Sequence, residues 1–187
     1  MDKQDLWVLD GGMGRELARR GAPFRQPEWS ALALMEAPET VREVHQAYAT
    51  SGARVITTNS YALVPFHIGE ARFAAQGEAL AALAGQLARD VADEQGGAVK
   101  VAGSLPPLFG SYRADLYQAE RVSELATPLI RALSPHVDLW LAETMSLIAE
   151  PLALKALLPQ DSKPFWVSFT LEDEAPGCEP TLRSGER

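Results

Sequence analysis

The sequence has only one cysteine, Cys178, so no disulfide can form within the chain. Scarce cysteine suits a reducing compartment, and we expect the protein to be cytoplasmic. Basic residues are also in the minority, because 17 Lys and Arg stand against 25 Asp and Glu, and the net charge is −8. This negative charge argues against nucleic acid or an anionic membrane as the main partner.

Several familiar sequence signals are missing as well. No stretch approaches the roughly 18 apolar residues of a membrane-spanning helix, and the polar N-terminus is not typical of a signal peptide. No nucleophile elbow or phosphate-binding loop occurs. Gly12 and Gly14 form a G-x-G pair, but Leu17 stands where a dinucleotide-binding fingerprint needs its third glycine.

The three histidines and the single cysteine show no spacing that is typical of metal ligands. His45 falls within a helical pattern and His136 just precedes an expected strand, so a structural role is favoured for both. His67 lies in an expected loop near the end of a strand, and its role stays open.

The composition is that of a globular protein, with 47 % hydrophobic and 22 % charged residues. A chain of 187 residues can bury one sizeable core but is too short for two ordinary domains. We therefore expect a single domain over residues 1–187.

Short apolar segments alternate with amphipathic ones along the chain. We expect strands at 6–9, 54–58, 99–102, 137–142 and 165–170, and helices at 16–20, 38–51, 70–94, 119–133 and 150–158. Residues 24–33 are expected to be irregular, and the polar tail from Leu171 is expected to form no further element. The alternation predicts an α/β fold whose parallel strands are joined by crossover helices.

Each expected strand ends in polar or glycine residues. Parallel strands direct their carboxyl ends to one side of a sheet, where such folds bind their ligands. We therefore expect a site built from strand-end residues, namely Asp10, Thr58 with Asn59, Gly103 with Ser104, Glu143 with Thr144, and Ser168.

The end of the first strand is the most distinctive stretch, Asp10-Gly11-Gly12-Met13-Gly14. Its glycines let a ligand approach the backbone, and a helix starting near Glu16 would favour an anion beside these N–H groups. The alternative is a tight turn between strand and helix, in which the glycines serve geometry alone.

Asp10 and Glu143 are acids at two different strand ends, where they could share an amino group or act as an acid/base pair. A helix cap for Asp10 and a surface ion pair for Glu143 are the structural alternatives. Thr57, Thr58 and Asn59 offer hydroxyl and amide groups nearby, unless they only satisfy neighbouring backbone groups.

An ordered set of stretches resembles the homocysteine S-methyltransferase family and covers nearly the whole chain. The first are Leu9-Asp10-Gly11-Gly12-Met13-Gly14-Arg15-Glu16-Leu17, Trp29-Ser30-Ala31 with Pro38, His45 through Tyr48, Gly52-Ala53, and Ile56-Thr57-Thr58-Asn59-Ser60-Tyr61. The others are Val101-Ala102-Gly103-Ser104-Leu105-Pro106-Pro107, Ser111-Tyr112-Arg113, Ala142-Glu143-Thr144, Val167-Ser168-Phe169, and Leu182-Arg183-Ser184-Gly185-Glu186.

The resemblance implies a (β/α)8 barrel of the TIM type, to which this chain would contribute about five βα units. It implies transfer of a methyl group from S-methylmethionine, S-adenosylmethionine or betaine to homocysteine, which forms methionine, or to a related thiol or selenol. Asp10, Gly11 and Gly12 would then hold the amino-acid end of homocysteine, and Glu143 would bind its ammonium group. Thr58 and Asn59 would line the pocket, and a loop beginning at Ser104 would border it.

The resemblance also implies zinc, which three cysteines hold in the family and which lowers the pKa of the acceptor thiol. We expect those cysteines to lie beyond Arg187, and we expect Cys178, alone in a polar stretch, not to bind zinc. The chain by itself is therefore expected to be inactive in methyl transfer.

Two other interpretations remain. The chain could be a non-catalytic binding or assembly module that pairs with itself, or with a complementary fragment, through the open edges of its sheet. It could also be a different barrel enzyme, such as a lyase with Glu143 as base, but no basic residue is expected beside Glu143 at the strand ends.

Overall fold

The computed structural model describes residues 7–160, 163–173 and 179–187. Leu6, where the first strand was expected to begin, and Cys178 lie outside the described residues.

Four parallel strands form one sheet in the order β1-β2-β3-β4. They span Val55–Thr57, Lys100–Leu105, Leu139–Met145 and Phe165–Phe169. Within the described residues the α-helices are α1 (Met13–Arg19), α2 (Ser30–Glu36), α3 (Pro38–Thr50), α4 (Pro65–Ile68), α5 (Glu70–Glu94), α6 (Val122–Leu133) and α7 (Ala149–Leu157). The predicted parallel α/β fold is confirmed.

The expected first strand is reduced to a single bridge. Leu9 pairs in parallel with Val55, and the N–H of Asp10 donates to the Val55 carbonyl at 2.9 Å. The expectation of five strands is therefore wrong for the described residues, which form four strands and this bridge. The pairing stops there because the chain turns away at Gly11 and enters α1 at Met13.

Residues 24–33 were expected to be irregular, but α2 begins at Ser30 and continues to Glu36. Ser30 through Leu34 are all buried, so the helix lacks the polar face by which an amphipathic helix is recognised. The tail after β4 also contains one unexpected pairing, an antiparallel bridge between Leu171 and Leu182.

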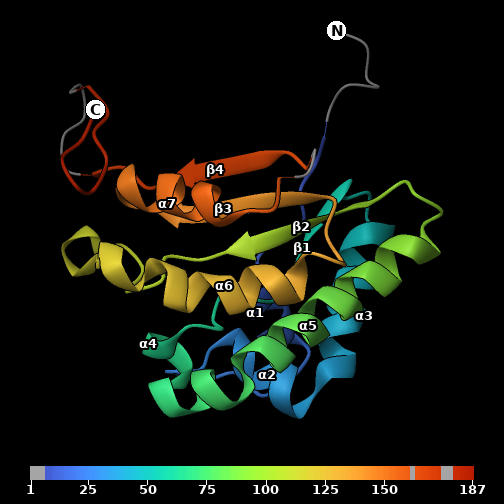
Figure 1. The fold of residues 1–187 in the computed structure, drawn as a ribbon. Helices are drawn as coiled ribbons and strands as arrows, with labels where there is room; N and C mark the ends of the chain where they lie inside the picture. Colours follow the sequence, from blue (N-terminus) through green and yellow to red (C-terminus); the bar gives the residue numbers. More distant parts are fainter. Residues whose placement is uncertain (1–6, 161–162, 174–178) are drawn as a thin grey trace, which may run out of the picture.

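The two faces of the sheet pack differently. The outer face lies against the helices, and the largest buried side chain of that core is Trp140. Figure 1 shows α5 and α6 running beside one another along this side, and both contact β2. The inner face carries a smaller cluster of Val55, Ala102, Leu139 and Leu141, with Trp166 packed against it.

The sheet is strongly curved. Trp7 precedes the bridge to β1, whereas Trp166 lies in β4 at the opposite edge of the sheet. Their ring centroids are nevertheless 6.3 Å apart in an edge-to-face contact. Two edges can approach in this way only if the twisted sheet curls around its inner face, as in a barrel wall.

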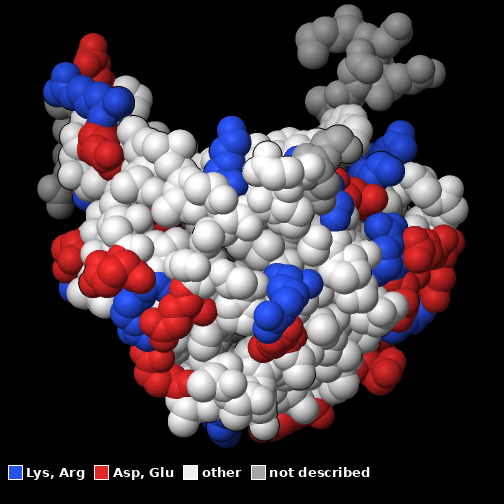
Figure 2. All heavy atoms as spheres, in the orientation of Figure 1, with Lys and Arg blue, Asp and Glu red and all other residues white. Residues whose placement is uncertain are grey.

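The helical surface carries mixed charge (Figure 2). Arg121 bonds Glu70 at 3.2 Å and Glu124 at 3.1 Å, and Arg131 pairs with Glu78. Such exposed pairs contribute little to stability. Within the described residues, none of the helices combines the length and the apolar character that a membrane crossing needs.

Candidate functional site

A cavity of about 930 Å³ opens at the carboxyl ends of the strands. Six of the expected strand-end residues line it, namely Asp10, Thr58, Asn59, Glu143, Thr144 and Ser168. The predicted convergence of these residues is confirmed. Gly103 and Ser104 are not among the lining residues, because β2 runs on to Leu105 and Ser104 is fully buried within it.

Asp10 is fixed by the end of β1. Its Oδ2 accepts the backbone N–H of Thr57 at 2.7 Å, and its Oδ1 accepts the Thr57 hydroxyl at 3.0 Å. Burial raises the pKa of Asp10 to about 6, although both hydrogen bonds act in the opposite direction. Asp10 does not cap α1, whose N-cap is Gly12 and which receives no side-chain cap.

Glu143 lies at an irregularity near the end of β3. The register with β4 shifts between Ala142 and Met145, and Thr144 adopts a positive φ of 63°. The hydroxyl of Ser104 donates to Glu143 Oε1. Burial raises the pKa of Glu143, the Ser104 hydrogen bond lowers it, and the nearby charge of Asp10 raises it again.

Neither carboxylate has a basic partner among the described residues, so the expected alternative of a surface ion pair for Glu143 is not observed. Burial raises the pKa of both acids, and the charge of Asp10 further raises that of Glu143, so a bound cation would stabilise their ionised forms. The arrangement therefore suits a positively charged ligand group such as an ammonium.

A closed hydrogen-bond network among Thr58, Ser60 and Ser104 holds the residue that binds Glu143. The N–H of Ser104 donates to Thr58 Oγ1 at 3.0 Å, the hydroxyls of Thr58 and Ser60 are 2.8 Å apart, and Ser60 Oγ donates to the Ser104 carbonyl at 2.8 Å. All three side chains are buried. The hydroxyl of Thr58 thus holds Ser104 in place, and Ser104 in turn holds Glu143.

Asn59 and the glycine turn complete the polar part of the cavity. The amide of Asn59 donates to the Ser30 carbonyl at 3.1 Å, which ties the end of β1 to the start of α2. Gly11 and Gly12 are exposed and line the cavity. The expected contacts of these residues with a ligand stay predictions.

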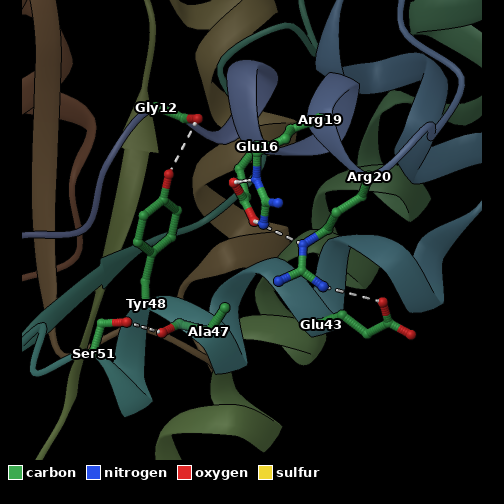
Figure 3. A network of polar contacts seen from close by, with 8 residues as sticks. All are labelled: Gly12, Glu16, Arg19, Arg20, Glu43, Ala47, Tyr48 and Ser51. Atoms are coloured by element: carbon green, nitrogen blue, oxygen red, sulfur yellow. Dashed lines mark hydrogen bonds and ion pairs between the residues drawn. The ribbon is translucent and has the colours of Figure 1, made fainter.

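Tyr48 of α3 supports the glycine turn from below (Figure 3). Its hydroxyl donates to the Gly12 carbonyl at 3.3 Å. Beside it, Glu16 binds both Arg19 and Arg20, and Arg20 reaches Glu43 of α3 at 3.4 Å. These contacts join α1 to α3, so the turn is held at both ends.

Gly11→Ala should lower the free energy of unfolding by about 1 to 3 kcal/mol, because overpacking displaces well-packed groups. A Cβ at Gly11 would lie 2.9 Å from two atoms of the Tyr48 side chain. Gly12→Ala is the matched control, since its Cβ would meet nothing nearer than Arg15 Cγ at 4.0 Å. Urea unfolding measures both variants, and equal stabilities would contradict the account of Tyr48.

Backbone strain is concentrated at the cavity. Among the described residues, three other than glycine have positive φ, which are Trp29 at 49°, Tyr112 at 64° and Thr144 at 63°. All three line the cavity. Such conformations cost about 1 to 3 kcal/mol each and cluster at functional sites.

The sequence analysis did not identify the aromatic walls of the cavity. They are formed by Phe24, Trp29, Tyr61, Phe66, Phe109 and Tyr112. Phe24 and Trp29 pack edge to face with centroids 5.5 Å apart. Tyr61 could have been found, because it closely follows the polar end of a strand. Phe24, Trp29, Phe109 and Tyr112 come from segments between elements, and Phe66 lies in the short helix α4.

His45 and His136, for which a structural role was favoured, do not line the cavity, whereas His67, whose role was left open, does. His45 is fully buried, and neither ring nitrogen has a hydrogen-bond partner among the described residues. His136 is partly buried on the helical side, against Gly85 of α5. His67 lines the cavity, and its Nδ1 donates to the Pro27 carbonyl at 2.9 Å, because a carbonyl can only accept.

A resident metal ion does not fit the described residues. Among them, no group of three or more His, Cys, Asp and Glu side chains lies close enough together to hold one.

Comparison with known proteins indicates one protein family for this chain. The family model described as homocysteine S-methyltransferase matches residues 7–187. The homocysteine S-methyltransferase of Escherichia coli K12 is 36 % identical over 195 residues, which cover 92 % of this chain and 61 % of that protein. Homocysteine S-methyltransferase YbgG of Bacillus subtilis is 30 % identical, again over 92 % of this chain and 61 % of that protein.

The crystal structure of the Escherichia coli homocysteine methyltransferase MmuM in its metallated form is also similar, with a TM-score of 0.80 and 36 % identity. The match covers 99 % of this chain and 68 % of that one. This chain thus spans 61 % of the length of the two curated relatives above.

Proposed function

Because this chain belongs to the homocysteine S-methyltransferase family, we propose that its cavity binds homocysteine and forms the acceptor site of a methyl transfer. The acceptor thiol would lose its proton to solvent, and the resulting thiolate sulfur would attack the methyl carbon of an onium donor. The bond between that carbon and the donor heteroatom would break, and its electron pair would stay on the donor. The donor then leaves without its positive charge. A related selenol is a second acceptor candidate, since one relative is a selenocysteine methyltransferase of Astragalus bisulcatus.

The observation that carries the proposal is the pair of acids without a basic partner. Asp10 follows the bridge to β1 and Glu143 lies in β3, both line one cavity, and the charge of Asp10 raises the pKa of Glu143. An ammonium group between them would satisfy both carboxylates. Gly11 and Gly12 present exposed backbone on the same cavity, where the carboxylate of the amino acid would lie.

The aromatic walls support an onium donor. Cations with methyl groups bind to the faces of aromatic rings, and Trp29, Tyr61 and Tyr112 provide such rings in the cavity. S-methylmethionine, S-adenosylmethionine and betaine all carry this kind of cation.

Zinc is expected from the family resemblance, but the described residues do not form a site for it. The residues of this chain bind and orient the amino-acid end, keep Glu143 in position through Ser104, and shield the reacting atoms with apolar walls. We also propose that the curved sheet is part of a (β/α)8 barrel, to which this single domain contributes four strands and the bridge at Leu9.

The affinity for homocysteine should fall by about tenfold when the pH is lowered from about 7 to about 5, because one protonated carboxyl no longer attracts the ammonium. The pKa of Asp10 is raised to about 6, so Asp10 is ionised at the upper pH and protonated at the lower one. Homocysteine keeps both its ammonium and its carboxylate charged over this range. Bound ammonium lowers the carboxyl pKa, so binding releases protons below pH 6.

Calorimetric titration in buffers of different ionisation enthalpy measures both the affinity and the proton release. A matched titration with Asp10→Asn should show a weaker pH dependence. Homocysteine binding that does not change between the two pH values would contradict the proposed acid pair.

A non-catalytic assembly module is the second candidate. It is favoured by apolar side chains exposed at both edges of the sheet, such as Val8 at 49 % and Phe169 at 41 %. Methyl-transfer assays with S-methylmethionine, homocysteine and added zinc separate the two candidates. Robust turnover by this chain would refute the expectation that it is inactive alone and would favour the enzyme.

A further inference from the structure

Arg113 differs from every other residue on the cavity wall. Among the lining residues, which are all described, it is the only Lys or Arg. The two acids, Asp10 and Glu143, are fixed at the ends of β1 and β3, whereas Arg113 belongs to the loop that follows β2. The cavity therefore has an acidic end and one separate cationic group.

The loop that carries Arg113 is held in a strained conformation. Tyr112 has a φ of 64°, and the preceding Gly110 has a φ of 152°. The hydroxyls of Tyr61 and Ser111 are 2.7 Å apart, which fastens the loop to the segment after β1. On its outer side, the guanidinium of Arg183 lies 5.0 Å from the ring centroid of Tyr112. These contacts keep Arg113 at the cavity wall.

The guanidinium of Arg113 already holds a carboxylate. Its Nε donates to Asp115 Oδ1 at 2.8 Å and its Nη2 donates to Asp115 Oδ2 at 2.7 Å. This two-point geometry is the one by which arginine recognises carboxylates. Both side chains are exposed, at 55 % for Arg113 and 61 % for Asp115, so the pair is weak and can exchange its partner.

Asp115 itself is not among the residues that line the cavity, whereas Arg113 is. A ligand carboxylate that enters from the cavity can therefore replace Asp115 and keep both hydrogen bonds. The exchange leaves the number of charges in contact unchanged. Asp115 acts in this case as an internal competitor for the arginine.

We propose that Arg113 binds the carboxylate of the methyl donor, while the acid pair binds the ammonium of the acceptor. The inference rests on the proposed function and adds the residue that binds the donor. The donor is an onium compound that also carries a carboxylate, such as an amino-acid sulfonium. Onium donors without a carboxylate are selected against.

The competing explanation is that the Arg113–Asp115 pair only stabilises its own loop. The two explanations predict opposite effects of Asp115→Asn on the affinity for the donor. If the pair only stabilises the loop, loss of either partner should disturb the loop, and both variants should bind the donor more weakly. If Asp115 competes with the donor, Arg113→Gln weakens donor binding and Asp115→Asn strengthens it.

The test is calorimetric titration of S-methylmethionine into the chain saturated with homocysteine. Arg113→Gln should weaken donor binding by about 10- to 100-fold, because hydrogen bonds to a charged group are lost. Asp115→Asn should strengthen it by about 2- to 5-fold, as expected for release of an exposed pair. The decarboxylated analogue, an aminopropyl dimethylsulfonium, should bind the wild type and Arg113→Gln equally.

Arg113→Lys provides a second variant that keeps the charge but loses the two-point geometry, and its affinity should lie between those of the wild type and Arg113→Gln. Three results would overturn the inference. The wild type fails to bind S-methylmethionine, the wild type binds the decarboxylated analogue as tightly as S-methylmethionine, or both Arg113→Gln and Asp115→Asn bind S-methylmethionine more weakly than the wild type. Homocysteine is titrated alone in parallel. Its failure to bind the wild type contradicts the proposed function, whereas normal homocysteine binding with unchanged donor affinity in Arg113→Gln overturns only the role of Arg113.

Discussion

Replacing Glu143 by glutamine should weaken homocysteine binding by about 30-fold or more, since loss of one partner from a largely buried charge pair costs about 2 to 5 kcal/mol. Glutamine keeps the size of the side chain, and its carbonyl can still accept the hydroxyl of Ser104. The change therefore removes the negative charge and leaves the support from Ser104 in place. Titration calorimetry with reduced homocysteine near neutral pH measures the loss.

Glu150→Gln is the matched control for this variant. Glu150 is also a buried acid with a raised pKa, and its Oε1 accepts the N–H of Leu108 at 2.8 Å. It does not line the cavity. We expect Glu150→Gln to bind homocysteine as the wild type does. Similar affinities of Glu143→Gln and the wild type would remove Glu143 from the site.

Acidification should destabilise the fold through His45. Burial lowers the pKa of His45 from 6.5 to about 4, and neither ring nitrogen has a hydrogen-bond partner within the described residues. Below pH 6.5 the unfolded chain therefore takes up a proton that the folded chain does not. The stability that depends on neutral His45 is present above this pH and is lost as the pH falls toward 4, by up to about 3 kcal/mol.

His45→Leu isolates this effect. Asp10, Glu143 and Glu150 have raised pKa values, which stabilise the fold as the pH falls and therefore act in the opposite direction. Urea unfolding of the wild type and the variant from about pH 7 to about pH 4.5 cancels these contributions in the difference. The variant should gain relative stability on acidification. A constant difference between the two proteins would show that His45 is not buried in its neutral form.

The sequence predicted the side of the sheet on which the site lies, and the reason is physical. Parallel strands bring their carboxyl ends together whatever the connecting loops do, so Asp10, Thr58 and Glu143 could be grouped from strand positions alone. The two acids were identified because a charge at the end of an apolar strand needs a partner. The structure shows that this partner is not a basic residue among those described.

The role of Ser104 could not be predicted from its position in the sequence. It was expected on a loop at the border of the pocket, yet it lies inside β2 and holds Glu143. The end of a strand depends on its neighbours, and β3 supplies a partner for Leu105. The shift in register beside Thr144 also depends on pairing between strands, which leaves no local signal.

The helix α2 and the aromatic walls of the cavity were not predicted from the sequence, because they too depend on tertiary packing. A helix that is buried on all sides has no polar stripe, and Ser30 to Leu34 show none. Trp29 and Tyr112 line the cavity, and both have positive φ values that residues other than glycine rarely adopt. Tertiary packing sets these backbone conformations, so they cannot be predicted from the local sequence.

The most direct test of the central claim compares homocysteine with its desamino analogue, sulfanylbutanoate, in titrations of the wild type and Glu143→Gln. If the Asp10–Glu143 pair binds the ammonium group, the wild type should bind the analogue about 100-fold more weakly than homocysteine, because the analogue leaves two buried carboxylates without a cation. Glu143→Gln should discriminate far less between the two ligands. Equal affinity of the wild type for both compounds would contradict the claim.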